Sequence, residues 1–549
     1  MPSTPTTKSQ VQAYRFVLRR MQSALVRKDA VMLHDPMRTH SRATIVGVCL
    51  AALGLLGFLI WGILAPKPKV PDKDGIVIGK PSGQVYVFLA QPQAKLIPTF
   101  NLASARLMLY ARSLGNQDQS KQVGGNSGPV NKGSQQVVAP SLIDDNELRD
   151  IQRGRKVGIP DGPDLLPSKD QRIDPYWTVC DQYILDKDLP DPASQNKVET
   201  TVIAGVNDLG PELKDNESLL VRAPNKEVYL VYRTPATANL PNTNTVRAKV
   251  NMADQYVRTA LNIDEKDIRN VTTGLLNAIP EKAELVSPDI AGRGSQPSFA
   301  MGDNLAVGAV FSVQPTGEAP AYYVVLDKGI ERISQTTADL IRYFDNIGAP
   351  DPPRLSPEVV SRSPVIDDRI DDLTFPARRT EVLQPGNYPV ACLGWTVSGE
   401  GDSMIERTSV HVGKAVPGVP RDSAGNSASV DVSTPSADGI RVDHFYMPPG
   451  RAAVVRQATS AQDFRTGQIT LISDRGVKYG VPDEATAQVL GLDDQRPASR
   501  EIIKLLPDGA SLSARDVEQS FDSVPYGSGE YPSTSANAGQ GGSGQSGGG

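Results

Sequence analysis

A stretch of 21 residues without a charge, Ile45–Ala65, constrains this chain more than any other feature of its sequence. A helix rises about 1.5 Å per residue, so the stretch is long enough to cross a hydrocarbon core of about 30 Å. A buried core helix would show a polar stripe, and this stretch has none. The 44 residues before it are too many for the n-region of a signal peptide. The sequence therefore predicts a transmembrane helix.

The flanking charges predict how that helix is oriented. Residues 1–44 carry eight basic and two acidic side chains, a net charge of +6, with Arg38 and Arg42 nearest the membrane. Basic flanks stay in the cytoplasm. We therefore expect a short cytoplasmic arm and a large exported region. The whole chain has a net charge of −5, which offers no basic footprint for nucleic acid.

Cysteine usage agrees with an exported region. Of the three cysteines, Cys49 lies inside the predicted span, which leaves Cys180 and Cys392 outside it. An oxidising compartment permits a bridge between these two, which are 212 residues apart. The alternative is two buried free thiols that never meet. The exported location favours the bridge.

The cytoplasmic arm contains an apolar seam on one helical face. Its members recur at spacings of three and four residues: Val11, Tyr14, Leu18, Met21 and Leu25. Basic side chains occupy much of the remainder. Such a helix is too short to form its own core, so it must dock on a partner or lie on anionic lipid. The sequence leaves these two alternatives open.

The exported region repeats one theme four times, namely a β-hairpin followed by a short helix. The four units begin near residues 85, 219, 323 and 470. A solenoid would keep a fixed period, so unequal spacing indicates related modules with different insertions around a shared middle domain.

The third and fourth units align at their hairpin turns. Asp327 and Gly329 of the third match Asp474 and Gly476 of the fourth. The glycines are expected where a tight turn needs a positive φ, and the aspartates can bond the turn backbone.

These patterns predict an α+β fold with a cytoplasmic helix, one membrane span and an elongated exported region of four hairpin-helix repeats around a central mainly-β domain. The expected divisions are 1–44 arm, 45–65 span, 66–75 linker, 76–111 first repeat, 112–200 loop and start of the central region, 201–285 second repeat, 286–350 third repeat, 351–465 second part of the central domain, 466–521 fourth repeat and 522–549 disordered Gly/Ser tail.

The sequence offers little for catalysis. A P-loop needs a Ser or Thr after its Gly-Lys, and here Ala415 follows Lys414. The exported histidines, His411 and His444, are isolated from each other and from cysteine, which favours structural roles. We predict no catalytic residue, no metal site and no cofactor.

Nine strings occur in order over almost the whole chain: TTKSQVQAYRFVLRRM at 6–21, DPMRTHSRA at 35–43, NLASARL at 101–107, VGIPDGP at 157–163, WTVC at 177–180, GLLNAIPE at 274–281, YYVVLDKGI at 322–330, DRGVKYGV at 474–481 and LLPDGASLSARD at 505–516. Together they resemble the EccB family, the membrane-anchored component of type VII (ESX) secretion systems.

The resemblance implies four related repeats around a central domain, stapled by Cys180 and Cys392. It also implies assembly with the motor ATPase EccC, with EccD and EccE, and with the mycosin protease into a hexameric inner-membrane translocon. ATP is a candidate cofactor only because members of the family have been labelled ATPases. The leading hypothesis is that the protein serves as a structural subunit of that translocon, in contact with membrane lipid. The alternatives are a peptidoglycan-binding module and, last, an ATP-hydrolysing component.

Overall fold

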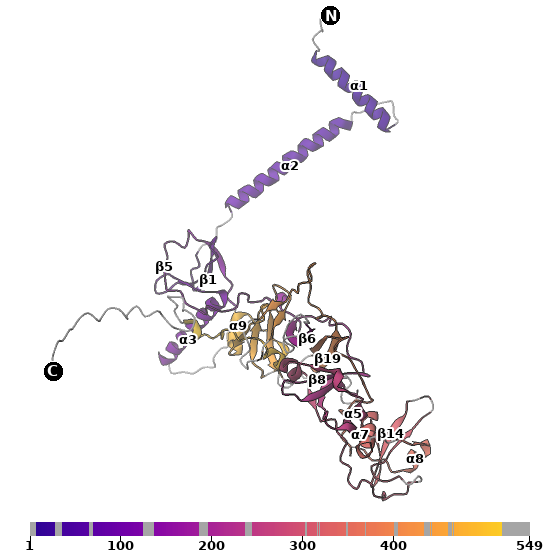
Figure 1. Ribbon diagram of the computed structural model, residues 1–549. Helices are drawn as coiled ribbons and strands as arrows, with labels where there is room; N and C mark the ends of the chain where they lie inside the picture. Colours follow the sequence, from indigo (N-terminus) through magenta and orange to yellow (C-terminus); the bar gives the residue numbers. More distant parts are fainter. Residues whose placement is uncertain are drawn as a thin grey trace, which may run out of the picture. The chain divides into compact units, whose positions relative to one another are not determined.

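A computed structural model describes most of the chain and divides it into two compact units, Met1–Lys69 and Val70–Gly549 (Figure 1). We describe each unit by itself. The described residues are 7–27, 36–64, 70–123, 137–185, 196–235, 244–301, 305–315, 317, 319–346, 350–367, 369–399, 404–432, 440, 442–458, 464 and 466–518.

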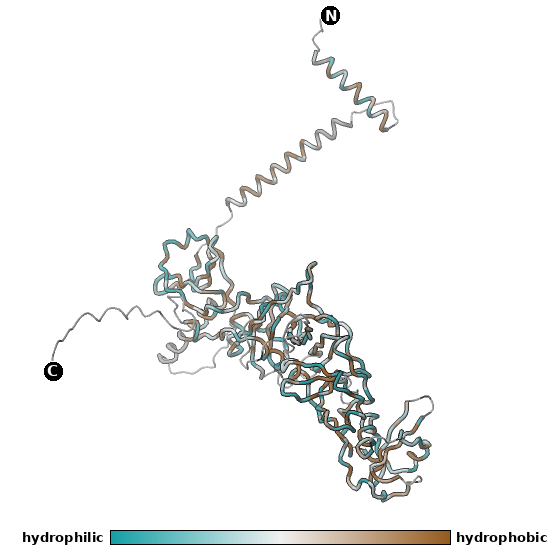
Figure 2. The backbone as a smooth tube through the Cα atoms, viewed as in Figure 1, coloured by the Kyte–Doolittle hydropathy of each residue, from teal (hydrophilic) through white to brown (hydrophobic). Residues whose placement is uncertain are grey.

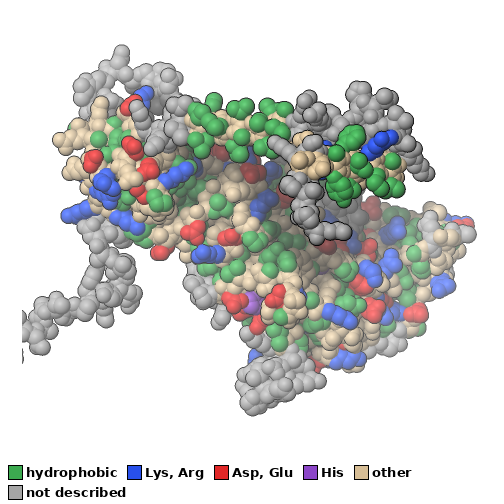
Figure 3. Space-filling model, turned by 90° about the horizontal axis from the view of Figure 1, so that it is seen from above, with side chains coloured by type: hydrophobic (Ala, Val, Ile, Leu, Met, Phe, Trp, Pro, Cys, Tyr) green, Lys and Arg blue, Asp and Glu red, His purple; other side chains and the backbone are tan. Residues whose placement is uncertain are grey.

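The first unit consists of two helices, α1 (Lys8–Arg27) and α2 (Pro36–Leu64). A proline at the first position of α2 suits a helix start, because its missing N–H would have no partner there. The segment Ala43–Gly62 of α2 is long and apolar enough to cross a membrane. Its large apolar side chains are 46–80% exposed. The tube in Figure 2 carries the brown of hydrophobic residues along this segment of α2. Figure 3 shows hydrophobic side chains gathered in green on one face of the molecule. The predicted membrane helix thus has its counterpart in α2, while Ala65 and residues 66–69 of the predicted linker lie outside the described residues.

The first sheet of the second unit has the strand order β4-β1-β2-β3-β5. Strands β1 to β3 form an antiparallel meander, helix α3 follows, and β4 and β5 return parallel to β1 and β3. The bounds are β1 Gly75–Lys80, β2 Val85–Leu89, β3 Lys95–Pro98, α3 Leu102–Val123, β4 Ser141–Asp144 and β5 Gln152–Arg153.

The second sheet repeats this order of elements. Strands β8 to β10 form the meander, α5 follows, and β11 and β12 return parallel to β8 and β10; β17 also pairs with β8. The bounds are β8 Glu217–Arg222, β9 Val228–Arg233, β10 Thr245–Lys249, α5 Gln255–Leu261, η2 Glu265–Asp267, β11 Ile268–Asn270, α6 Thr273–Ala278, β12 Glu281–Lys282 and β17 Glu381–Val382.

The third and fourth sheets follow the same path. Each has a meander, a helix and a strand parallel to the first strand of the meander (β16 to β13, and β25 to β22). In each, a further single bridge runs parallel to the third strand. The bounds are β13 Val310–Val313, β14 Ala321–Leu326, β15 Gly329–Ile333, α7 Gln335–Asp345, β16 Arg354–Leu355, α8 Pro357–Arg362, β22 Ala453–Ala458, β23 Ile469–Ile472, β24 Lys478–Val481, α9 Glu484–Leu490, β25 Arg496–Ser499, α10 Arg500–Ile503 and η5 Asp516–Glu518.

Side-chain caps begin the main helices of the first, third and fourth sheets, α3, α7 and α9. Asn101 accepts a hydrogen bond from the backbone N–H of Ser104 at 2.8 Å, before α3. Ser334 and Asp483 make the corresponding bonds at the starts of α7 and α9. Each cap satisfies a donor that the first helical turn leaves free.

A fifth, central sheet has the order β19-β18-β6-β7-β21-β20 and is built from strands far apart in the sequence. The chain leaves it after β7 and returns at β18, having formed the second and third sheets in between. The bounds are η1 Lys169–Gln171, β6 Trp177–Leu185, β7 Asn196–Ala204, β18 Val390–Ser398, β19 Ile405–Gly413, β20 Val430–Asp431 and β21 His444–Tyr446.

The buried cores show which sheets are neighbours. The largest core joins residues of the central, second and fourth sheets, among them Trp177, Leu219 and Val455. A second core joins the first and fourth sheets, where α3 packs against α9. A third joins the second and third sheets, where α5 packs against α7. The first sheet therefore contacts the fourth, the fourth, central and second sheets share one core, and the second sheet contacts the third.

The meander of each unit has one strand more than the predicted hairpin, and the parallel strands that follow each helix were not predicted either. In the first, third and fourth sheets a further strand precedes the predicted hairpin. In the second sheet, β10 lies between the predicted hairpin and the helix. Helix α3 also continues to Val123, into the region 112–200 that was predicted to begin with a loop, and no proline interrupts it. The predicted Gly/Ser tail lies outside the described residues.

Candidate functional site in the central sheet and the N-terminal helices

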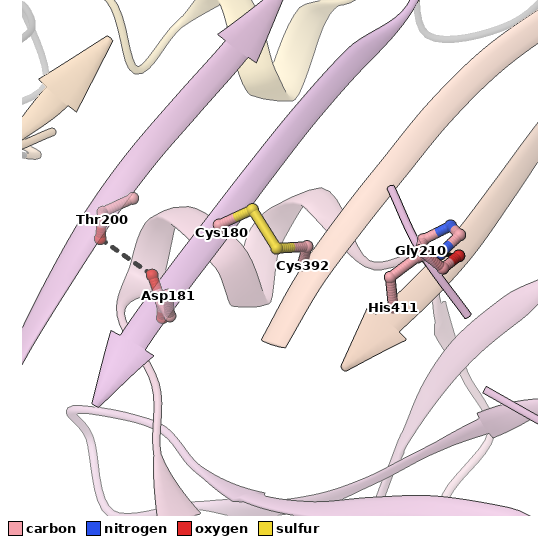
Figure 4. Close-up of a disulfide and its surroundings, with 6 residues drawn as sticks. All are labelled: Cys180, Asp181, Thr200, Gly210, Cys392 and His411. Atoms are coloured by element: carbon pink, nitrogen blue, oxygen red, sulfur yellow. Dashed lines mark hydrogen bonds between the residues drawn. A yellow bond between two sulfur atoms is a disulfide. The ribbon is translucent and has the colours of Figure 1, made fainter. Parts of the chain in front are cut away.

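The predicted disulfide is present at the middle of the central sheet. Cys180 on β6 and Cys392 on β18 face each other in antiparallel register and are joined by a disulfide, with both side chains buried (Figure 4). The same register places Trp177 opposite Trp395. In the chain-entropy model, a bridge across 212 residues stabilises the fold by about 5 kcal/mol.

Asp181, next to the bridge, joins the central sheet to the second. Its carboxylate accepts hydrogen bonds from the hydroxyl of Thr200 at 2.9 Å, and from the hydroxyl and backbone N–H of Thr272 at 2.9 and 2.7 Å (Figure 4 shows the first). Thr272 is the N-cap of α6. Burial raises the pKa of Asp181 to about 6, and these hydrogen bonds act in the opposite direction.

The sequence alone did not identify Asp181. The sequence does contain one indication of a buried carboxylate. Asp181 directly follows a cysteine and is the one charged residue in the strand WTVCDQYIL. Such a position predicts a buried carboxylate, but only the fold supplies its partners, which are 19 and 91 residues away in the chain.

Arg269 fixes the segment that leads back into the central sheet. Its guanidinium donates to the carbonyls of Leu383 and Tyr388 at 3.0 and 2.9 Å. Burial lowers the pKa of Arg269 to about 10. A buried guanidinium without carbonyl partners would be strongly destabilising, so these two bonds hold the segment in place.

The two exported histidines have local partners. His411 lies between the hydroxyl of Ser409 and the carbonyl of Gly210, each at 3.0 Å, and burial lowers its pKa. The neutral ring donates to the carbonyl and accepts from the hydroxyl. His444 contacts Asp431 at 2.9 Å and Glu199 at 3.3 Å. Within the described residues, no group of three or more histidine, cysteine or acidic side chains is arranged to hold a metal ion.

The predicted seam of α1 is exposed along its whole length. Its five side chains are 39–80% exposed, and Phe16, Val17 and Val26 are exposed as well. The helix carries no acidic residue. Phe16 and Val26 lie off the face of the seam, so apolar side chains occupy more than one side of α1. Arg38 and Arg42 lie in the first turns of α2, and their side chains are outside the described residues.

The predicted turn residues act differently from one another. Gly476 has a φ of +79°, as expected, whereas Gly329 does not have a positive φ. Gly329 is required by space instead, because a Cβ there would meet the backbone carbonyl of Pro364. The aspartates bond neighbouring loops rather than their own turns: Asp327 accepts from the hydroxyl of Ser298, and Asp474 accepts from the backbone N–H of Gly450.

Among the described residues, one apolar helix long enough to span a membrane follows an exposed basic helix. A second unit consists of small mixed sheets, and a disulfide links two neighbouring strands of its central sheet. Together these features define a membrane-anchored α+β protein. The comparisons with known proteins specify the class further. The family described as "Type VII secretion system ESX-1, transport TM domain B" matches residues 3–526, and the chain belongs to this family, EccB. The protein is therefore a membrane component of type VII (ESX) secretion.

Curated relatives match the chain over nearly their whole length. The ESX-1 secretion system ATPase EccB1 of Mycolicibacterium smegmatis (strain MKD8) is 29% identical over 526 residues, which cover 95% of this chain and 96% of the relative. The ESX-3 secretion system ATPase EccB3 of M. smegmatis (strain ATCC 700084) is 27% identical over 532 residues, which cover 94% and 91%.

Solved structures share the fold. A chain in the structure of an intact ESX-5 inner membrane complex has a TM-score of 0.63 and 23% identity, covering 96% of this chain and 98% of its own length. A chain in the structure of the EccB3 dimer from the ESX-3 core complex has a TM-score of 0.62 and 23% identity, covering 81% and 100%. At this identity the likeness speaks for the fold.

Proposed function

We propose that the protein is a structural subunit of the type VII secretion inner-membrane complex. In this role α1 docks on partner subunits, α2 anchors the chain, and the unit beginning at Val70 oligomerises on the exported side. The observation that carries the proposal is the exposure of apolar side chains on α1, a helix that has no core of its own. Exposed apolar surface of this extent marks an interaction site.

The orientation is part of the proposal. The arm before the membrane helix has a net charge of +6, and basic segments next to a span stay in the cytoplasm. The disulfide supports the same orientation, because a bridge persists in an oxidising compartment.

The protein partners proposed are EccC, EccD, EccE and the mycosin protease, together with further copies of this chain in a hexameric assembly. The resemblance of the sequence motivates them. Similar chains occur in the structures of an ESX-5 inner membrane complex and of an EccB3 dimer, which supports assembly and self-association.

We also propose that the four small sheets are copies of one ancestral unit arranged around the central sheet. The support is their common order of elements: meander, helix, a strand parallel to the first, and a pairing parallel to the third. The unit limits would then be set by the strands, so the fourth unit begins at β22 rather than at residue 466.

The test of docking is the double variant Leu18→Asp with Met21→Asp. Two carboxylates would be placed in the proposed interface, where unpaired charge is strongly unfavourable. We expect the variant to be lost from the complex purified from membranes in mild detergent, while its exported unit keeps the disulfide and its resistance to protease.

The matched control is Gln12→Asp with Ser23→Asp, which adds the same charge to the opposite side of α1. It should stay in the complex. If the Leu18 and Met21 variant remains in the complex at the level of this control, docking through the seam is wrong.

A second candidate, peptidoglycan binding, has one observation in its favour. A polar groove in the second unit is lined by amide and charged side chains, among them Asn216, Asn262, Lys266 and Gln384. Such groups hydrogen-bond hydroxyl-rich or amide-rich ligands. Retention of the full-length protein on purified cell wall at low salt, lost on Asn262→Leu with Gln384→Leu, would support it; no retention would discard it.

Relatives carry the word ATPase in their names, and this activity is the last candidate. A P-loop ends in Gly-Lys-Ser/Thr, and neither Gly79-Lys80-Pro81 nor Gly413-Lys414-Ala415 has the required hydroxyl residue. Specific binding of ATP must raise the apparent stability of the full-length protein. We expect no thermal shift at millimolar ATP, and a saturable shift would reverse this ranking.

A further inference from the structure

Between the β18–β19 hairpin and the fourth sheet lies a narrow pocket that the proposed function does not use. Its walls include Trp395 and Val397 of β18, Glu406 of β19, Pro497 of β25 and the side chain of Phe464. Apart from the Glu406 carboxylate, the lining is almost entirely apolar. The space inside is about that of one water-sized group.

The carboxylate of Glu406 is incompletely partnered in this pocket. One oxygen accepts a hydrogen bond of 2.6 Å from the indole N–H of Trp395. Among the described residues, that indole is its one side-chain partner, and no basic side chain there forms an ion pair with it. Burial raises the pKa of Glu406, and the hydrogen bond from Trp395 only partly offsets this effect. A carboxylate in this setting is stabilised by a positive charge brought from outside.

The remaining walls suit a cation with an apolar stem. The electron-rich faces of aromatic rings attract ammonium groups, and Trp395 and Phe464 both line the pocket. Val397 and Pro497 offer apolar surface against which methylene groups can pack. An ammonium group is about the size of a water molecule and fits the space, whereas the planar guanidinium of arginine is larger.

We propose that the pocket formed by Trp395, Glu406 and Phe464 binds the ε-ammonium group of a lysine side chain presented by a partner protein chain. The ammonium group fills the water-sized space and pairs with the free oxygen of Glu406, while the methylene groups of the lysine lie outside that space. This contact is independent of the docking of α1, because it lies in the other compact unit of the chain.

The chain offers a direct probe of this pocket because it contains three tryptophans, Trp61, Trp177 and Trp395. Full-length protein labelled with 5-fluorotryptophan in detergent gives one ¹⁹F resonance for each tryptophan. The resonance that is lost in the variant Trp395→Phe is assigned to Trp395. The ligand is Nα-acetyl-lysine methylamide. The corresponding norleucine amide has a similar stem without the charge, and the arginine amide tests the size of the cation.

We expect the lysine amide to shift the Trp395 resonance in a saturable way, while the Trp177 resonance, from a buried ring, stays in place. The norleucine amide should have no effect, and the arginine amide should bind at least about tenfold more weakly than lysine. Glu406→Gln keeps the shape of the side chain and its bond to Trp395, and it should weaken lysine binding at least about tenfold. An unchanged Trp177 resonance in this variant verifies that the sheet is folded.

Three results would overturn the proposal. The first is no shift of Trp395 with the lysine amide, which would leave the pocket to a bound water. The second is an equal shift with ammonium chloride at the same concentration, which would make the pocket a site for small cations. The third is equal binding to wild type and Glu406→Gln, which would remove the carboxylate from recognition.

Discussion

Replacing Asp181 with asparagine should change how the stability of the protein depends on pH. Burial raises the pKa of this carboxyl group from 3.8 to about 6. A shift of about two units, at about 1.4 kcal/mol per unit, corresponds to about 3 kcal/mol between the two protonation states. Because the folded pKa lies above the unfolded value, the stabilisation is full below the unfolded pKa and is lost as the pH rises through about 6.

Asparagine removes this dependence while keeping the local contacts. Its amide oxygen can accept from the backbone N–H of Thr272, and its NH₂ group can donate to the hydroxyls of Thr272 and Thr200, which rotate to accept. Relative to wild type, the unfolding free energy of Asp181→Asn should therefore rise by up to about 3 kcal/mol between about pH 4 and pH 7.5. Other carboxyl groups titrate in both proteins and cancel in the difference.

The assay is urea unfolding of the full-length protein in detergent, followed by tryptophan fluorescence, because Trp177 lies on the same strand as Asp181. The control is Asp289→Asn, an exposed carboxylate that should leave the pH profile unchanged. If the difference between wild type and Asp181→Asn is the same at every pH, the buried carboxylate is not the source of the pH dependence.

Three further predictions test the packing of the second unit. Replacing Cys180 and Cys392 with serine should lower the unfolding free energy by up to about 5 kcal/mol, measured by urea unfolding, and an unchanged midpoint would contradict the entropic argument. Arg269→Met should destabilise the fold by about 2 kcal/mol and speed hydrogen exchange in residues 383–388, the segment that it holds; protection equal to wild type would show that the two carbonyl bonds contribute little. Gly476→Ala should lower the melting temperature, because φ is +79° there and a Cβ would approach a neighbouring phenylalanine ring at 2.7 Å; an unchanged melting temperature would mean that the turn relaxes at no cost.

Local patterns were enough to predict several features of the chain. An uncharged run of residues predicted the membrane segment of α2. The pairing of Cys180 with Cys392 followed from counting cysteines outside the membrane span. Each of these inferences needs only composition or neighbours within a helical turn.

The meander strand that was not predicted in each unit shows where local sequence patterns fail. Strand β13, VFSV, is buried at every position, so it lacks the alternation that marks a half-buried strand. Strand β10 is separated from β9 by a long connection, so the sequence has no tight-turn signal to indicate that these two strands are paired. Short strands of this kind are specified by the sheet that they complete.

The buried polar groups could not be predicted from the sequence for a related reason. Asp181 and Arg269 are fixed by partners about 90 to 120 residues away in the chain, at contacts made only when the second sheet meets the central sheet. Glu406 likewise acquires its apolar surroundings from the fourth sheet, through Pro497. A carboxylate in a strand indicates such a site only once the neighbouring sheet is known.

The position of the disulfide explains why the central sheet can carry so large an insertion. The second and third sheets lie between β7 and β18, so pairing β6 with β18 requires the closure of a long loop. The Cys180–Cys392 bridge lies within this pair of strands and removes most of that entropy from the unfolded chain. Asp181, the next residue, then bonds Thr272 at the start of α6, inside the insertion. One covalent link and one buried hydrogen-bonded carboxylate thus hold the insertion to the sheet at neighbouring positions, and a rigid connection of this kind is what a scaffold subunit requires.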